Sequence, residues 1–458
     1  MTKYKSKLVR SILVAAVALS TAAGMGACSS DDNKASDGAT TTDAATDTTG
    51  TDATTAQADN SGDSGGEAVE LQMAWWGDSE TNNKMISLLG TFSEKNPGIT
   101  VIGQGADWDS YFSKLSTQVA GGTAPDVQQH YPSTIQEYFS RGALADLNSF
   151  SNLDLSGIDQ NLLDSLTIDG SLVGVPMTIM THAFMYLPDV LAEAGVDAPA
   201  ASWTWDDFAQ FCKDVTAGLG KTNVYGCADG SANDAALQVY LHGIGKDLVT
   251  ADGQLAFDEA DFVTWLQFWA DLRDAGAITP PDVAGYDSSS TETDPMIQGV
   301  SASSWRYSGD LQGWQPAAPS EIQMVPYPGV VADKAGWLIS GDLLSIYSGT
   351  KYPEEAAAVV NFFINDTAVP AVVTGRMPAK EVMQEALRAQ GNADASKMID
   401  LIGLVSDNAG PVPPLSPAGW SEVSNLLGVV AQEVAYGSST PEAAAARFFA
   451  EAPAMLQG

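Results

Sequence analysis

Histidine, cysteine and basic residues are scarce in this chain. Its 458 residues include 3 histidines, 3 cysteines and 21 lysines and arginines against 57 aspartates and glutamates, for a formal net charge of −36. None of the histidines has a second histidine or a cysteine at ligand spacing, so we expect no metal site and no cofactor. The surplus of negative charge repels nucleic acid and anionic lipid, so neither is an expected partner.

Signatures of common enzyme classes are also missing. Gly220-Lys221-Thr222 ends like a phosphate-binding loop, but Val215 stands where that motif needs its first glycine. Asp206 and Asp207 begin a predicted helix and are interpreted as capping residues. We therefore expect no catalytic residues. Carboxylates from distant loops can still form a glycosidase site, so a secreted glycoside hydrolase stays as an alternative.

The N-terminus has the pattern of a secretory signal peptide. A basic start is followed by a short apolar run, too short to span a membrane, and then by small residues up to Cys28. A cysteine in this place resembles the cleavage site of bacterial lipoproteins. We predict a signal peptide at 1–27 and a lipidated Cys28, and the alternative is an ordinary signal peptide with an incidental cysteine.

The next segment cannot build a core. Residues 29–68 contain no Leu, Ile, Val, Met or aromatic residue and consist mainly of Thr, Asp, Ala, Ser and Gly. Such a composition cannot bury enough apolar surface to offset the entropy of ordering. We predict that 28–68 is a lipidated, disordered tether that holds the folded body at the extracellular face of the cell membrane.

Leu71–Phe150 repeats one pattern three times. Apolar strands at 71–75, 99–102 and 125–129 each lead into a polar or aromatic loop and then into an amphipathic helix. Strands that alternate with helices indicate βαβ units and a parallel sheet, hence an α/β fold. Ligands of open α/β sheets bind beyond the carboxyl ends of the strands, so these loops are a candidate binding wall.

Tryptophan is frequent, with 11 in the chain. Trp75 alternates with Trp76 along its strand and is expected in the core, as are Trp265 and Trp269 on one helix face. Six others lie outside helix faces: Trp76, Trp108, Trp305, Trp314, Trp337 and Trp420. Their ring faces can pack on the C–H faces of sugars, or hold a cation.

Cys212 and Cys227 are the cysteines that remain after Cys28. In an exported chain their short separation favours a disulfide over two free thiols.

Several segments together resemble the extracellular solute-binding proteins of ABC sugar importers, the group that includes maltose-binding protein. The resemblance lies in the order and spacing of Phe92–Ile99, Trp108–Leu115, Ala120–Val127, Tyr138–Leu147, Gly174–Pro176, Trp203–Phe208, Pro353–Ala357 and Gly375–Ala379.

The resemblance implies two α/β lobes that close on a ligand about hinge strands. The first lobe would comprise 69–176 plus 341–375, and the second 182–330 plus 381–458. The hinge crossings would lie at 177–181, 331–340 and 376–380.

By position, the resemblance also implies a set of ligand-binding residues. They are Trp76, Asp78, Trp108, Gln129, His130, Thr181, His182, Trp305, Arg306, Tyr307 and Trp337. Two positions depart from the pattern, because relatives often carry Asp where His130 stands and Asn where Met180 stands. The expected protein is a monomeric lipoprotein that binds an oligosaccharide and delivers it to an ABC permease. A peptide, polyol or cationic solute is the alternative ligand.

Overall fold

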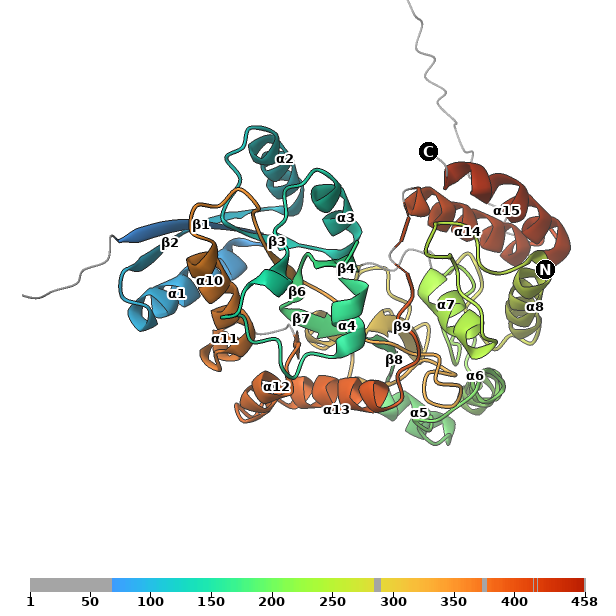
Figure 1. Ribbon diagram of the computed structural model, residues 1–458. Coiled ribbons are helices and arrows are strands. Elements are labelled where there is room, and N and C mark those ends of the chain that lie inside the picture. The colour runs from blue at the N-terminus through green and yellow to red at the C-terminus, as the bar shows by residue number, and fades with distance from the viewer. Residues whose placement is uncertain (1–67, 284–289, 373–376, 415, 418, 457–458) are drawn as a thin grey trace, which may run out of the picture. The chain divides into compact units, whose positions relative to one another are not determined.

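The computed structural model describes residues 68–283, 290–372, 377–414, 416–417 and 419–456. The predicted signal peptide, Cys28 and nearly all of the predicted tether lie outside these ranges. Within them the chain forms two lobes with separate hydrophobic cores, each built on its own sheet (Figure 1).

The first lobe is built on a five-stranded sheet of order β2-β1-β3-β12-β6, with helices on both of its faces (Figure 1). Its elements are β1 (Val69–Trp76), α1 (Ser79–Lys95), β2 (Ile99–Ala106), α2 (Trp108–Ala120), β3 (Val127–His130), α3 (Pro132–Ser140), η1 (Leu147–Ser149), α4 (Gln160–Ser165), β4 (Thr167–Ile168), β5 (Ser171–Leu172), β6 (Val175–Pro176), β12 (Leu343–Ile346), α10 (Pro353–Asn365) and α11 (Ala368–Val372).

The three predicted βα units are confirmed, and β1 runs parallel to both β2 and β3. Helix α1 buries Met85, Leu88, Leu89 and Phe92 against the sheet because these residues fall on one face. Ile86, on the same helix, is 46% exposed.

The sheet as a whole is mixed rather than parallel. Strand β12 runs antiparallel to both β3 and β6, between which it lies. The prediction of a parallel sheet is therefore correct for β1, β2 and β3 but wrong for the complete sheet. Strand β12 comes more than 160 residues after β6 in the sequence. The βα pattern of the N-terminal region therefore cannot predict where it joins the sheet.

The second lobe has a three-stranded antiparallel sheet of order β10-β8-β9, surrounded by helices. Its α14 and α15 pack side by side and next to α8 (Figure 1). The elements are β8 (His182–Tyr186), α5 (Pro188–Ala194), α6 (Trp205–Leu219), α7 (Asp234–Gly243), α8 (Glu259–Asp274), β9 (Ser303–Tyr307), η2 (Ser308–Asp310), α9 (Leu311–Trp314), β10 (Gln323–Val325), α13 (Ala393–Asp407), α14 (Trp420–Ala435) and α15 (Pro441–Met455). Helix α12 (Glu381–Arg388) packs on both cores, through Met383 on the first and Leu387 on the second.

A small sheet of order β11-β7-β13 joins segments that are far apart in the sequence. Strand β7 (Thr178–Met180) pairs antiparallel with β11 (Ile339–Ser340) on one side and with β13 (Met377–Pro378) on the other. Met177, just before β7, belongs to the core of the first lobe, whereas Ile179 belongs to that of the second. The chain therefore passes between the two cores at this sheet.

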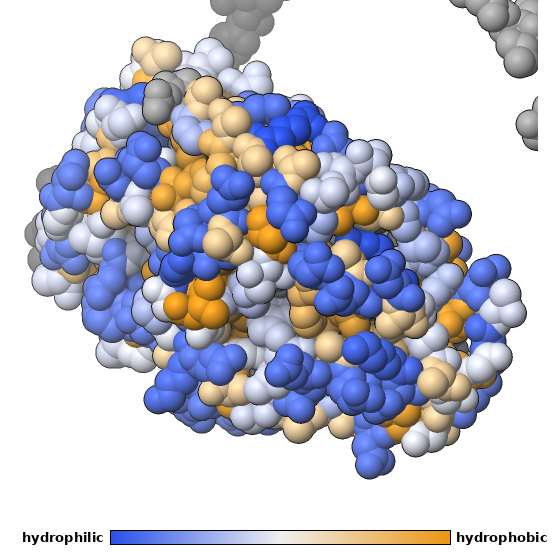
Figure 2. Space-filling model, turned by 90° about the vertical axis from the view of Figure 1, so that its right-hand side faces the viewer, coloured by the Kyte–Doolittle hydropathy of each residue, from blue (hydrophilic) through white to orange (hydrophobic). Residues whose placement is uncertain are grey.

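Large aromatic residues and one covalent link anchor the cores. Trp75, Trp265 and Trp269 are fully buried, as predicted. Cys212 in α6 is bonded to Cys227 in the loop that follows this helix. On the side of the second lobe shown in Figure 2, hydrophilic residues are spread widely, with hydrophobic residues between them.

Candidate ligand-binding site

A cavity of about 250 Å³ is lined by both lobes and by the segment around β11. The residues that give it its character are aromatic or polar: Tyr131, His182, Asp234, Gln238, Tyr307, Trp337, Ser340 and Trp420. Pro413 and Pro414 add rigid apolar surface. Of the eleven predicted ligand-binding residues, the structure brings three to this pocket, namely His182, Tyr307 and Trp337.

The pairing of β8 with β9 explains why two of these residues are neighbours. His182 and Tyr307 lie opposite each other in the strand register, with 5.3 Å between their ring centroids. Tyr327 packs on the same imidazole at 5.2 Å. Burial lowers the pKa of His182 to about 3, so its ring is neutral near pH 7. Its Nδ1 atom is buried and has no hydrogen-bond partner among the described residues.

Trp337 stands between two histidines. Its ring lies 4.7 Å from that of His182 and 5.0 Å from that of His242. His242 is held by contacts of its Nδ1 atom with the Ala335 carbonyl at 3.2 Å and of its Nε2 atom with Asp247 at 3.0 Å. Thr181, also predicted to touch ligand, does not line the cavity and instead donates from Oγ1 to the Trp337 carbonyl at 3.1 Å. These contacts fix the indole in the pocket wall.

The aromatic residues of the first lobe form a chain that reaches the pocket. Trp76 and Trp108 pack edge-on with 5.0 Å between ring centroids, and Trp108 lies 6.1 Å from Tyr131, which lines the cavity. Trp108 is 43% exposed, whereas Trp76 is 8% exposed and packs also on Tyr111 and Phe112. Trp108 is therefore the solvent-accessible tryptophan of this pair, and Trp76 is the buried one that packs against it.

Gln129 and His130 are buried in the sheet and do not line the cavity. Gln129 Nε2 donates to Asp342 Oδ1 at 2.6 Å, which ties β3 to the residue that precedes β12. The His130 ring contacts Gln128 Oε1 through Nε2 at 3.1 Å and packs on Tyr138. Burial lowers the pKa of His130 to about 3. The structure gives both residues a place in the core of the first lobe.

Asp78 is the N-cap of α1. Its carboxylate accepts a hydrogen bond from the Thr81 amide at 2.8 Å, and this bond lowers the pKa of Asp78. The side chain is exposed and outside the cavity. A capping aspartate at this point is an ordinary way to satisfy a free amide of the first helical turn.

Trp305 lies in the core of the second lobe rather than in the pocket. It is 6% exposed, packs on Trp205, Phe208 and Trp269, and donates from Nε1 to the Ala228 carbonyl at 3.0 Å. A Cβ atom at Gly230 would lie 2.8 Å from that Nε1, so the indole fits only over a glycine. This placement argues against the predicted ligand contact.

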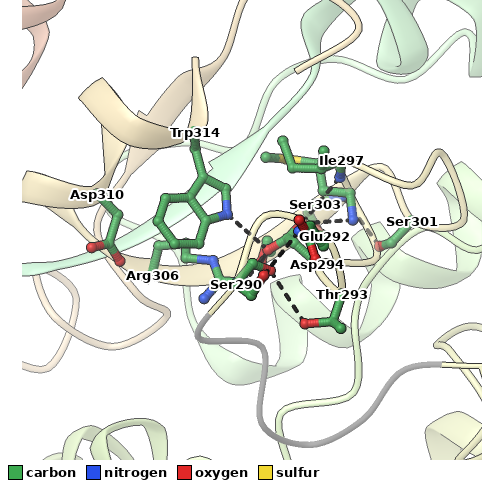
Figure 3. A network of polar contacts seen from close by, with 12 residues as sticks. Ser290, Glu292, Thr293, Asp294, Ile297, Ser301, Ser303, Arg306, Asp310 and Trp314 are labelled. Carbon is green, nitrogen blue, oxygen red and sulfur yellow. Dashed lines mark hydrogen bonds and ion pairs between the residues drawn. The ribbon is translucent and has the colours of Figure 1, made fainter. Parts of the chain in front are cut away.

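Arg306 belongs to a buried polar network, shown in Figure 3, and likewise does not line the cavity. Its guanidinium is paired with Asp294, and its Cζ atom lies 4.6 Å from the ring centroid of Trp314. Asp294 also accepts from Ser304 Oγ at 2.7 Å and from Trp314 Nε1 at 3.1 Å. Of the three ligand-binding residues predicted at 305–307, Tyr307 is the one that lines the pocket.

Five of the aromatic or polar pocket residues named above were not among the predicted contacts: Tyr131, Asp234, Gln238, Ser340 and Trp420. Trp420 is the first residue of α14 and follows Gly419, whose positive φ of 79° makes the turn. Its position outside a helix face is the one signal in the sequence that pointed to it. Asp234 and Gln238 lie one turn apart on α7 and carry no comparable signal.

Within the described part of the chain, no cluster of three or more His, Cys, Asp or Glu residues is arranged to hold a metal ion. None of the helices described there combines the length and apolarity needed to cross a membrane.

Comparison with known proteins identifies the family that shares this fold. Residues 87–397 match the family model of bacterial extracellular solute-binding proteins. The extracellular solute-binding protein family 1 from Alicyclobacillus acidocaldarius superposes with a TM-score of 0.76 at 28% identity, over 86% of this chain and 100% of that one. A periplasmic oligogalacturonide-binding protein from Yersinia enterocolitica gives 0.73 at 22% identity, over 85% and 99%.

A relative by sequence is the diacetylchitobiose-binding protein DasA of Streptomyces coelicolor. It is 23% identical over 334 residues, which cover 69% of this chain and 73% of the relative. Since the family model spans well over half of the sequence, the chain belongs to the bacterial extracellular solute-binding proteins.

Proposed function

We propose that this protein captures an oligosaccharide in the pocket around Trp337 and delivers it to a membrane permease, without catalysing a reaction. Proteins of its family bind solutes outside the cytoplasmic membrane and work with ABC permeases. The observation that carries the sugar proposal is the wall of Tyr131, Tyr307, Trp337 and Trp420 around one cavity. Two similar proteins are named for the saccharides they bind, diacetylchitobiose and oligogalacturonide.

The pocket has the mixture of surfaces that a sugar requires. Pyranose rings present apolar C–H faces, which pack on aromatic rings, and hydroxyl groups, which need hydrogen-bond partners. Gln238, Ser340 and Asp234 supply polar atoms next to the aromatic side chains. A mostly apolar pocket with a few convergent polar groups is typical of small-molecule sites.

For the motion we propose hinge closure about the crossings at 177–181, 331–340 and 376–380, between the lobe boundaries predicted from the sequence. In support, β7, β11 and β13 form one small sheet at this place. Residue 376 lies outside the described ranges. Closure of two lobes around a ligand is a standard binding motion of two-domain receptors.

For the location we propose a lipid anchor at Cys28, which lies outside the described residues. Metabolic labelling with a radioactive fatty acid in a bacterial host tests this. The wild-type protein should incorporate label and sediment with membranes, whereas Cys28→Ser should do neither. Equal labelling of both proteins would contradict the anchor.

The test of binding is isothermal titration with a panel of purified oligosaccharides, followed in parallel by tryptophan fluorescence. We expect a single site per monomer and a fluorescence change, because Trp337 and Trp420 line the cavity. No heat and no fluorescence change with any saccharide would contradict the sugar proposal and favour a peptide, polyol or cationic solute. Chromatographic detection of cleaved oligosaccharide would instead favour a glycoside hydrolase.

A further inference from the structure

The pocket has a one-sided charge. Among the described residues that line it, Asp234 is acidic and none is Lys or Arg. His182 adds no positive charge near neutral pH, because burial lowers its pKa to about 3. The walls therefore offer a ligand one carboxylate and no cation.

A second cavity, of about 1010 Å³, has the same one-sided charge as the first. It shares Ser165, Val412, Pro413, Pro414 and Ser416 with the first cavity, so the two adjoin along this rim. Its lining adds Asp164, Asp169 and Asp252, and again contains no Lys or Arg among the described residues. A ligand that extends from the first cavity into the second meets acidic side chains in both cavities.

Asp234 is the acidic residue that lines the smaller cavity, and its surroundings compensate its charge only in part. It lies half-buried in the first turn of α7, where Oδ2 accepts a hydrogen bond from Ser424 Oγ at 3.0 Å. No basic side chain pairs with it among the described residues. Asp234 and Tyr307 line the same cavity, and burial, with a smaller contribution from the charge of Asp234, raises the pKa of Tyr307.

Two further features decide which ligand charge is favoured. The N-terminus of α7 carries a partial positive charge of roughly half a unit, which is smaller than the full negative charge of Asp234 in the same turn. The faces of Trp337, Trp420, Tyr131 and Tyr307 attract cations through their ring quadrupoles. Both the carboxylate and the aromatic walls therefore favour a positive group.

Resting on the proposed sugar-binding function, we propose that the pocket selects saccharides by charge, with Asp234 as a specificity-determining residue. A saccharide that carries a protonated amine binds more tightly than the neutral saccharide of the same length and linkage. The corresponding uronate, whose carboxylate would face Asp234 without a neutralising cation, is rejected.

The experiment compares three oligosaccharides of one length and linkage, namely the amino sugar, the neutral sugar and the uronate, in α-1,4 and β-1,4 series. Titrations run at about pH 6, where an amine with the pKa of an α-amino group is charged. We expect the amino sugar to bind about tenfold more tightly than the neutral sugar, and the uronate at least about tenfold more weakly, by the size of a partly desolvated charge interaction.

The variant Asp234→Asn removes the charge and keeps an oxygen for Ser424. It should reduce the ratio of the amino-sugar affinity to the neutral-sugar affinity to about twofold or less. Asp206→Asn is the matched control, because Asp206 occupies the first turn of α6 but is exposed and outside both cavities. It should keep the wild-type ratio. Circular dichroism and thermal midpoints check that both variants fold.

Uronate affinity equal to or above that of the neutral sugar overturns charge selection, and so does equal affinity for the amino and neutral sugars. A full amine preference in Asp234→Asn overturns the assignment to Asp234. If no saccharide of any charge binds, the proposed function itself fails, a result distinct from binding without charge preference.

Discussion

The indole ring of Trp337 meets the imidazole ring of His182 edge-on, with 4.7 Å between ring centroids and 71° between ring planes. Trp337 comes from the segment before β11, and His182 is the first residue of β8. The hydrogen bond from Thr181 to the Trp337 carbonyl holds these segments together. Since both rings line one cavity, the wall of the pocket is built on the same backbone that passes between the lobes.

Removal of the Trp337 ring should weaken ligand binding. Trp337→Ala deletes the aromatic face of the pocket wall, and we expect the affinity for the best saccharide to fall at least about tenfold, the size of a buried aromatic contact. Isothermal titration below the melting transition measures this. Trp337→Phe keeps an aromatic face and should retain most of the affinity. Equal affinity of Trp337→Ala and wild type would rule out ligand contact by this residue.

Replacement of Trp305 should lower the stability of the fold rather than the affinity for ligand. Its ring is enclosed by Trp205, Phe208 and Trp269, so Trp305→Ala leaves a cavity and should lower the free energy of unfolding by about 3–5 kcal/mol. Urea denaturation gives this value. A loss below about 1 kcal/mol would show that the side chain is not part of the core.

On the first lobe, Trp108 is the tryptophan that packs next to the pocket residue Tyr131. It is 43% exposed, so Trp108→Ala should change the free energy of unfolding by about 1 kcal/mol or less. If a bound oligosaccharide extends along the chain of rings from Tyr131, the variant should bind long oligomers more weakly and leave the affinity for disaccharides nearly unchanged. Titration with a length series separates these results, and equal losses at every length would argue against such an extension.

The disulfide between Cys212 and Cys227 closes a loop with a sequence separation of 15. Restricting the unfolded chain in this way stabilises the protein by about 3 kcal/mol. The double variant Cys212→Ser/Cys227→Ser should therefore lose about this amount in urea denaturation. Wild-type protein in a reducing agent should show a similar loss, whereas unchanged stability in both would mean that the bond contributes little.

Stability should fall in acid because of buried histidines. Burial lowers the pKa of His130 to about 3, against about 6.5 in the unfolded chain. Between these values the unfolded state binds a proton that the folded state does not. The free energy of unfolding therefore decreases as the pH is lowered from about 6.5, by about 1.4 kcal/mol per pH unit for each such histidine. His182 behaves in the same way.

Urea denaturation at several pH values between about 7 and 4 tests this expectation. His130→Gln, which does not titrate, should show a pH slope that is shallower by about 1.4 kcal/mol per unit. An unchanged slope would mean that the imidazole of His130 takes up its proton in the folded state.

Several helices of both lobes can be predicted from the sequence because their signals are local. The periodicity of α1, the capping Thr204 of α6 and Pro441 at the start of α15 each depend on residues within a few positions. The pairing of β12 with β3 and β6 depends on segments far apart in the chain. No local pattern encodes such a neighbour.

The site is harder to predict for a related reason. Trp305 and Tyr307 are two residues apart in β9 and so share a face of the strand. Helices α6 and α8 cover the first of them, whereas the second lies beyond this cover at the end of the strand. Aromatic character identifies both residues as candidates, but only the packing of distant helices decides which of them remains accessible.

Strand β12 has a consequence for the order in which the chain can fold. Leu343, Leu344 and Ile346 of β12 are fully buried between β3 and β6 of the first-lobe sheet. Until that segment has been synthesised and exported, β3 and β6 each keep an unpaired edge, which is a template for aggregation. The strands of the second-lobe sheet are complete by Val325. The lobe that begins the chain is therefore the one whose sheet closes last.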